Sequence, residues 1–190
     1  MPQSFVPFAA TVCGINELPG HCHEGVSHVL SILDPDHPGL AVFGEYGEHE
    51  RLELRFHDII DPRDGLVPPQ REDVEAILRL GRDLMAEPET CRHLLVHCHM
   101  GISRSTAALT MLLAQARPEL PAAEAMAAVV SIRKEVWPNL RMIEFADEML
   151  GRGGELVAAV RTRHREYALR RPEMVLFMRE NGREREVEGL

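Results

Sequence analysis

Residues 97–106 read His-Cys-His-Met-Gly-Ile-Ser-Arg-Ser-Thr and lie between two segments of different character. The run before them, 93–97, is short and apolar, as in a strand that is buried on both faces. The segment after them, up to Ala116, is rich in alanine and leucine, and Pro118 ends it. The stretch therefore predicts a buried strand, a short loop and a helix in direct succession.

The loop has the composition of an anion-binding site. Five residues separate Cys98 from Arg104, which is enough for the backbone to curl until several N–H groups point at one centre. Gly101, in the middle of the loop, can adopt backbone φ and ψ angles that other residues avoid. The N-terminus of the helix adds partial positive charge, and the Arg104 guanidinium can bind two phosphate oxygens. Such surroundings favour the thiolate form of a cysteine, so Cys98 is the candidate nucleophile.

A cysteine followed six positions later by an arginine is weak evidence by itself, because the chain has four cysteines and 20 arginines. The histidine before the cysteine, the glycine three positions after it and the serine after the arginine make the match specific. With these residues, 97–105, the sequence resembles the cysteine-based protein tyrosine phosphatases, specifically their compact dual-specificity-like branch. The signature of that family is His-Cys-x5-Arg-Ser/Thr. The resemblance covers residues 8 to about 151, with weaker matches at 25–33 and at the Trp-Pro-Asn sequence of 137–139.

The resemblance implies a catalytic role for several residues. Cys98 would attack phosphorus to form a cysteinyl-phosphate, and the Ser105 hydroxyl would stabilise the departing thiolate in the second step. Arg104 and the backbone N–H groups of the loop would hold the transferring group. No metal or other cofactor is required. The substrate-binding residues implied in this way are His99, Met100, Gly101, Ile102, Ser103 and Arg104.

The family also uses an aspartate on a separate loop as the general acid, placed after the strand that precedes the long helix. Three aspartates lie in residues 57–64, namely Asp58, Asp61 and Asp64. Asp58 follows the strand most directly and is the predicted acid, with Asp61 as the alternative. Asp64 stands next to Gly65 and is predicted to be a turn residue.

The remaining pattern predicts an α/β fold with a small, mostly parallel central sheet of four to five strands flanked by helices. Strands are expected at 8–15, 25–33 and 51–57 in addition to 93–97, and helices after Pro69 and at 121–136, 139–150 and 155–170. The phosphate-binding loop would lie between a buried strand and a helix. Residues 1–170 are expected to form the phosphatase-like domain, and the charged residues 171–190 a poorly ordered C-terminal tail.

Composition limits the class of protein. The chain has 190 residues, 45% of them hydrophobic, and carries a formal charge of −9, so we expect one globular domain with neither nucleic acid nor membrane as a partner. No apolar run approaches the length of a membrane helix, and no lysine or arginine precedes the apolar residues at 1–10. These features predict a cytoplasmic protein with reduced cysteines.

The predicted function is hydrolysis of a phosphorylated protein or a small phosphomonoester, and phosphotyrosine is the leading substrate, alone or with phosphoserine and phosphothreonine. A lipid substrate is disfavoured because the loop has no lysine. A phosphate-recognition module without turnover is the alternative, and sulfur transfer is a weaker one. Two His-Cys-His tripeptides, at 21–23 and 97–99, suggest a zinc site. Neighbouring side chains of an extended segment point to opposite faces, however, so the cysteine could not bind the same metal as both histidines without a turn. Tyr46 and Trp137 are candidates for a ring wall around phosphotyrosine.

Overall fold

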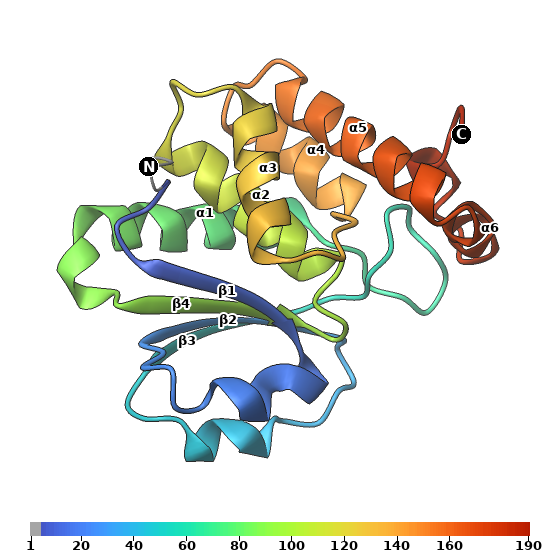
Figure 1. Cartoon of the computed structure of the whole chain (residues 1–190). Coiled ribbons are helices and arrows are strands. Elements are labelled where there is room, and N and C mark those ends of the chain that lie inside the picture. The colour runs from blue at the N-terminus through green and yellow to red at the C-terminus, as the bar shows by residue number, and fades with distance from the viewer. Residues whose placement is uncertain (1–4) are drawn as a thin grey trace.

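The computed structural model describes residues 5–190 and contains a four-stranded, all-parallel sheet (Figure 1). Along the sheet the order is β1-β4-β2-β3, so the strand that precedes the predicted loop is an inner one. The predicted α/β class is confirmed, with four strands and no antiparallel neighbour among them. The strands are β1 (Ala9–Gly14), β2 (His28–Leu33), β3 (Glu50–Arg55) and β4 (His93–Cys98).

Helices cover both faces of the sheet, α1 to α5 on one face and the 3-10 helices η1 and η2 on the other (Figure 1). The long helices are α1 (Arg71–Ala86), α2 (Arg104–Ala116), α3 (Ala122–Ile132), α4 (Leu140–Met149), α5 (Glu155–Arg170) and the shorter α6 (Glu173–Glu180). The 3-10 helices are η1 (Ile15–His21), η2 (Ala41–Glu45), η3 (Pro88–Thr90) and η4 (Glu184–Glu186). Among residues 5–190, no helix is both long and apolar enough to cross a membrane.

Strand β4 is buried along its whole length, and its side chains alternate between two cores. Leu94, Val96 and Cys98 belong to the core under the long helices. Leu95 belongs to the smaller core under η1 and η2, together with Cys13 of β1. Cys13 and Cys98 therefore lie on opposite faces of the sheet although their strands are neighbours. All four cysteines are free.

The carboxyl ends of the strands meet at the loop that follows β4. Gly14, the last residue of β1, pairs in register with Cys98, and the next backbone N–H, that of Ile15, donates to the His99 carbonyl at 3.0 Å. Asp34 follows β2, and Phe56 follows β3. The candidate site residues therefore lie at the carboxyl edge of the sheet, the edge at which parallel sheets commonly bind ligands.

The C-terminal residues differ from the poorly ordered tail that the sequence predicts. They form α6 and η4, and Arg183 and Glu186 are only 5% and 2% exposed. Met178 and Val187 pack against Trp137 in a third small core. The prediction failed because this segment is held by buried charge pairs as well as by apolar anchors, whereas alternating charges in a sequence usually indicate a solvated surface.

Candidate active site

The loop of residues 98–104 begins at the end of β4 and ends at the first residue of α2. Cys98 is buried, and its Sγ lies 3.1 Å from the Ser105 Oγ. Ser105 is in the first turn of α2, so the helix that supplies Arg104 also places a hydroxyl on the cysteine sulfur. The predicted nucleophile and the predicted thiolate-stabilising hydroxyl are therefore in contact.

Two glycines allow the loop to pass close to the end of β1. Gly101 has φ +67°, and a Cβ built on it would lie 2.4 Å from the Cys13 carbonyl carbon. A Cβ on Gly14 would in turn lie 2.8 Å from the His99 carbonyl oxygen. The backbone of β1 thus supports the underside of the loop, and no larger residue fits at either position.

Replacing Gly101 with alanine should destabilise the protein much more than the same change at Gly25. Both glycines have nearly the same φ, +67° and +69°, but a Cβ added at Gly25 would meet no atom within 4 Å. Gly25→Ala is expected to cost only backbone strain, about 1 to 2 kcal/mol. Gly101→Ala adds overpacking of about 1 to 3 kcal/mol. Urea unfolding of the two variants measures the difference, and equal losses would contradict the close approach of loop and strand.

Arg104 is anchored beneath the loop by residues that follow β2 and β3. Arg104 is 3% exposed, and its Nη1 donates to Asp34 Oδ1 at 2.7 Å and to the Phe56 carbonyl at 2.5 Å. Nε is buried and has no hydrogen-bond partner among residues 5–190. A buried donor without an acceptor is costly, and an oxyanion in the loop would relieve that cost.

Asp34 is a site residue that the sequence reasoning missed, because the Asp-Pro-Asp sequence reads as a turn. Its carboxylate pairs with Arg104, and its backbone N–H donates to His99 Nε2 at 3.3 Å. Burial and the neighbouring Arg104 charge lower the pKa of His99. The signal that could have identified Asp34 is an acidic residue directly after a buried strand at the carboxyl edge of the sheet.

Asp58 lies against the loop, as the sequence predicted. Its Oδ1 accepts hydrogen bonds from Ser103 Oγ at 2.8 Å and from Asn139 Nδ2 at 2.9 Å, and its side chain is 31% exposed. The third donor, Arg183 Nη1 at 2.9 Å from Oδ2, comes from the C-terminal segment and was not foreseen. Burial opposes ionisation of Asp58, but the charges of Arg183 and Arg104 outweigh it and hold its pKa below the usual value.

The other two aspartates of the 57–64 segment have different surroundings. Asp61 pairs with Arg185, whose Nε lies 3.0 Å and 3.2 Å from the two carboxylate oxygens. Arg185 also donates to Glu144 at 2.7 Å. Asp64 lies in a turn beside Gly65, which has φ +75°, as expected. Of the three, Asp58 alone is hydrogen bonded to a residue of the loop among the described contacts.

The predicted ring wall is wrong. Tyr46 is buried and donates its hydroxyl proton to the Leu18 carbonyl at 2.8 Å. Trp137 is fully buried, stacks on His164 with ring centroids 4.2 Å apart, and donates to Glu186 at 2.8 Å. Both rings serve the core because they carry polar groups that find buried partners. At the loop itself the exposed apolar side chain is Met100, at 67%.

His97 is also a core residue. It is fully buried beside Phe43, with ring centroids 5.6 Å apart, and neither ring nitrogen has a partner among residues 5–190. Burial lowers the pKa of His97 to about 4, so the ring is neutral near pH 7. Within the same residues, no group of three or more His, Cys, Asp or Glu side chains is arranged to bind a metal ion.

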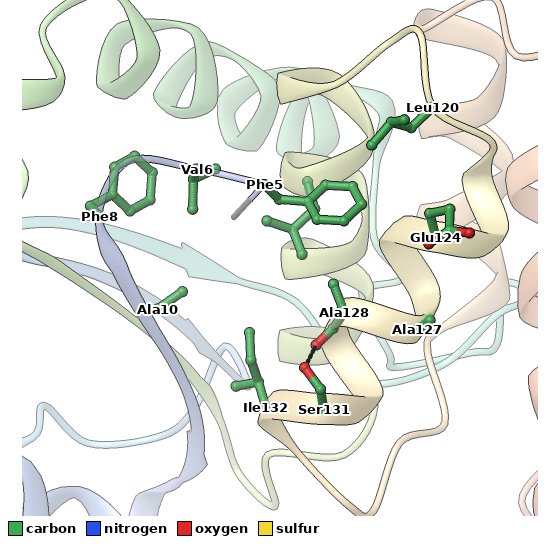
Figure 2. Close-up of a pocket in the computed structure, with 11 residues that line it drawn as sticks. Phe5, Val6, Phe8, Ala10, Leu120, Glu124, Ala127, Ala128, Ser131 and Ile132 are labelled. Atoms are coloured by element: carbon green, nitrogen blue, oxygen red, sulfur yellow. Dashed lines mark hydrogen bonds between the residues drawn. The ribbon is translucent and has the colours of Figure 1, made fainter. Parts of the chain in front are cut away.

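A hollow in the described part of the chain lies away from the loop (Figure 2). It has a volume of about 710 Å³ and lies between residues 5–10 and α3. Phe5 and Phe8 line it from one side, and Ala128 and Ile132 from the other. No residue of 98–105 lines this hollow, so it is separate from the candidate site.

Comparisons with known proteins give structural likeness only. No family model and no curated protein matches the sequence. Human DUSP28 matches with a TM-score of 0.55 and 14% identity over 75% of this chain and 91% of that one. The human tyrosine phosphatase-like serine/threonine/tyrosine-interacting protein matches with a TM-score of 0.56 and 17% identity, over 77% and 93%. PTPMT1 in complex with PI(5)P matches with a TM-score of 0.52 and 15% identity, over 76% of this chain and 91% of that one. The chain therefore has the fold of the dual-specificity and tyrosine phosphatase structures.

Proposed function

We propose that this protein is a cysteine-dependent phosphomonoesterase that acts on phosphorylated protein, with phosphotyrosine as the leading substrate. The observation that carries the proposal is the buried Arg104 guanidinium, which is anchored through Nη1 and keeps a buried Nε without a partner among residues 5–190. It stands at the N-terminus of α2, at the end of the loop that Cys98 begins. A fixed guanidinium, a helix N-terminus and a loop of backbone N–H groups together suit a phosphate dianion.

In the first step the Cys98 sulfur attacks phosphorus, an S–P bond forms and the bond to the leaving oxygen breaks. Arg104 and the backbone N–H groups of the loop stabilise the charge on the equatorial oxygens. Asp58 gives its proton to the leaving oxygen. In the second step Asp58 takes a proton from water, which attacks phosphorus, and the Ser105 hydroxyl stabilises the Cys98 thiolate that leaves. The products are an alcohol or phenol and inorganic phosphate.

The composition of the loop favours protein substrates over phosphoinositides. Residues 99–103 contain no lysine, and His99 carries no added charge near pH 7, because burial and Arg104 lower its pKa. The PTPMT1 structure contains a phosphoinositide, so lipid phosphate belongs in the test as a second substrate. We expect hydrolysis of a phosphotyrosine peptide to exceed that of a phosphoinositide presented in mixed micelles.

The alternative is a phosphate-recognition module of the same fold that does not turn over its ligand. One observation favours it: the Asp58 carboxylate already has three donors, and nearby arginines hold its pKa low, so little of it is protonated near pH 7. Binding needs the loop and Arg104, whereas fast turnover also needs a proton donor. Absence of hydrolysis of p-nitrophenyl phosphate by protein that binds inorganic phosphate would establish this alternative.

Exchanging each candidate acid for its amide should distinguish Asp58 from Asp61. Asp58→Asn is expected to lower kcat about 100-fold. The loss should be greater with phenyl phosphate than with p-nitrophenyl phosphate, because the poorer leaving group depends more on protonation. Asp61→Asn, the matched control, should keep wild-type kcat with both substrates. A larger loss in Asp61→Asn would identify Asp61 as the acid.

A further inference from the structure

We propose that Arg183 is a positioning residue of this site, which holds the Asp58 carboxylate against the phosphate-binding loop and sets the upper pH limit of the reaction. The inference rests on the proposed function, and it assigns Arg183, with its partner Glu186, to the active site. The sequence offers no hint of it, since 171–190 reads as a charged tail.

The contacts of Arg183 join three parts of the chain that lie far apart in sequence. Nη1 binds Asp58 at 2.9 Å, and Nη2 donates to the Ser103 hydroxyl at 3.0 Å. Ser103 in turn donates to Asp58 at 2.8 Å. The guanidinium therefore closes a ring of hydrogen bonds between the loop that carries the candidate acid and the loop that carries Cys98.

Arg183 is itself held by a buried carboxylate. Glu186 accepts from Arg183 Nε at 2.7 Å and from Nη2 at 2.8 Å. The same carboxylate accepts from Trp137 Nε1 at 2.8 Å and from the Leu140 backbone N–H at 2.9 Å, at the start of α4. Because the Glu186 carboxylate is buried and is itself fixed by Trp137 and the Leu140 backbone, it holds the Arg183 guanidinium in one orientation.

The charges around Asp58 are predominantly positive. Arg183 faces it from the C-terminal segment and Arg104 from α2, and His99 of the loop, the neighbouring titratable group, is neutral near pH 7. Each of the two arginines also has a carboxylate partner, Glu186 for Arg183 and Asp34 for Arg104. Asn139 and Ser103 donate without charge. Removing the charge at 183 therefore removes the main Coulombic support for ionised Asp58, while Arg104 remains.

The sign of the effect follows from the role of a general acid. In the enzyme–substrate complex kcat requires protonated Asp58, so kcat falls as pH rises through the pKa of that carboxyl. A contacting arginine lowers an aspartate pKa by about 1 to 3 pH units. With Arg183 in place, the basic limb of the plot of kcat against pH lies at low pH. Without the charge of Arg183, that limb moves to higher pH.

The test is the pH dependence of kcat for phenyl phosphate in four single variants. Arg183→Met should move the basic limb to higher pH by about 1 to 3 pH units. Glu186→Gln should move it in the opposite direction, because it takes away the negative charge that partly offsets Arg183. Arg183→Lys keeps the charge and should leave the limb near its wild-type position. Arg185→Met, the matched control, removes an arginine that binds Asp61 and should not move the limb.

If Arg183→Met folds too poorly for kinetics, the pKa of Asp58 can be measured directly by an NMR titration of its carboxyl carbon. Comparing wild type with Glu186→Gln is then sufficient. Opposite displacements for Arg183→Met and Glu186→Gln support the proposal. Lower kcat with an unmoved limb in Arg183→Met would overturn it and leave Arg183 a structural residue. A limb that moves in Arg185→Met instead would assign the acid to Asp61. No turnover by the wild type would contradict the proposed function itself, and this inference with it.

Discussion

The Cys98→Ser variant is expected to lose turnover of p-nitrophenyl phosphate by about 10⁵-fold or more. A serine hydroxyl is not ionised near neutral pH, and it is a far weaker nucleophile than a thiolate. The anion site stays intact in this variant, because Arg104, Gly101 and the start of α2 are unchanged. Inorganic phosphate should therefore bind Cys98→Ser and wild type with similar affinity, as measured by isothermal titration calorimetry.

Cys22→Ser is the matched control for this prediction. Its thiol is half-buried in the first His-Cys-His tripeptide and donates to the Pro19 carbonyl at 3.1 Å, a contact that a serine hydroxyl can also make. It should keep wild-type kcat. Retained activity in Cys98→Ser, or loss of activity in Cys22→Ser, would contradict the assignment of the nucleophile.

Arg104→Lys should lower kcat about 1,000-fold although the positive charge is kept. The guanidinium binds Asp34 and the Phe56 carbonyl through Nη1 and leaves Nε for an oxyanion. A single ammonium group cannot make both sets of contacts, and it lacks the planar fork that matches phosphate. Inhibition by inorganic phosphate should weaken in parallel, because the same donors bind the ground state.

Arg152→Lys provides the comparison for an arginine outside the site, whose side chain is 10% exposed. Arg152 also donates to carbonyl oxygens, those of Ala114, Pro118 and Leu120, so the substitution is expected to lower thermal stability. It should leave kcat unchanged. Equal kcat losses in Arg152→Lys and Arg104→Lys would mean that the Arg104 effect comes from destabilisation of the fold and not from phosphate binding.

Much of the fold could be predicted from sequence because local patterns and tertiary structure agree. The apolar run before Cys98 is the buried strand β4, and the alanine-rich segment after Arg104 is α2, which ends at the predicted Ala116. Asn139 caps α4 by accepting from the Met142 backbone N–H at 3.1 Å, and this helix was predicted from 139 onward. Such elements follow from periodicity and capping, which are local properties of the chain.

The parts of the site that escaped prediction depend on contacts between distant residues. Asp34 lies 70 positions from Arg104, and Ser103 lies 80 positions from Arg183. Nothing in the local sequence of residues 171–190 distinguishes Arg183 from the exposed arginines nearby. Its role depends on Glu186 and Asp58, which become its neighbours only after folding. The negative net charge of the chain has little effect on phosphate binding at this site, because a few fixed donors act on the phosphate at contact distance.

The central claim is a phosphoryl group carried on Cys98, and rapid acid quenching during turnover tests it most directly. Asp58→Asn is the protein of choice, because p-nitrophenyl phosphate does not need the acid for its first step, whereas hydrolysis of the intermediate does. Peptide mass spectrometry of the quenched protein should find one added phosphoryl group on the peptide that contains Cys98, and none in Asp58→Asn that also carries Cys98→Ser. Steady turnover without phosphorylation of Cys98, or phosphorylation of a different residue, would contradict the account.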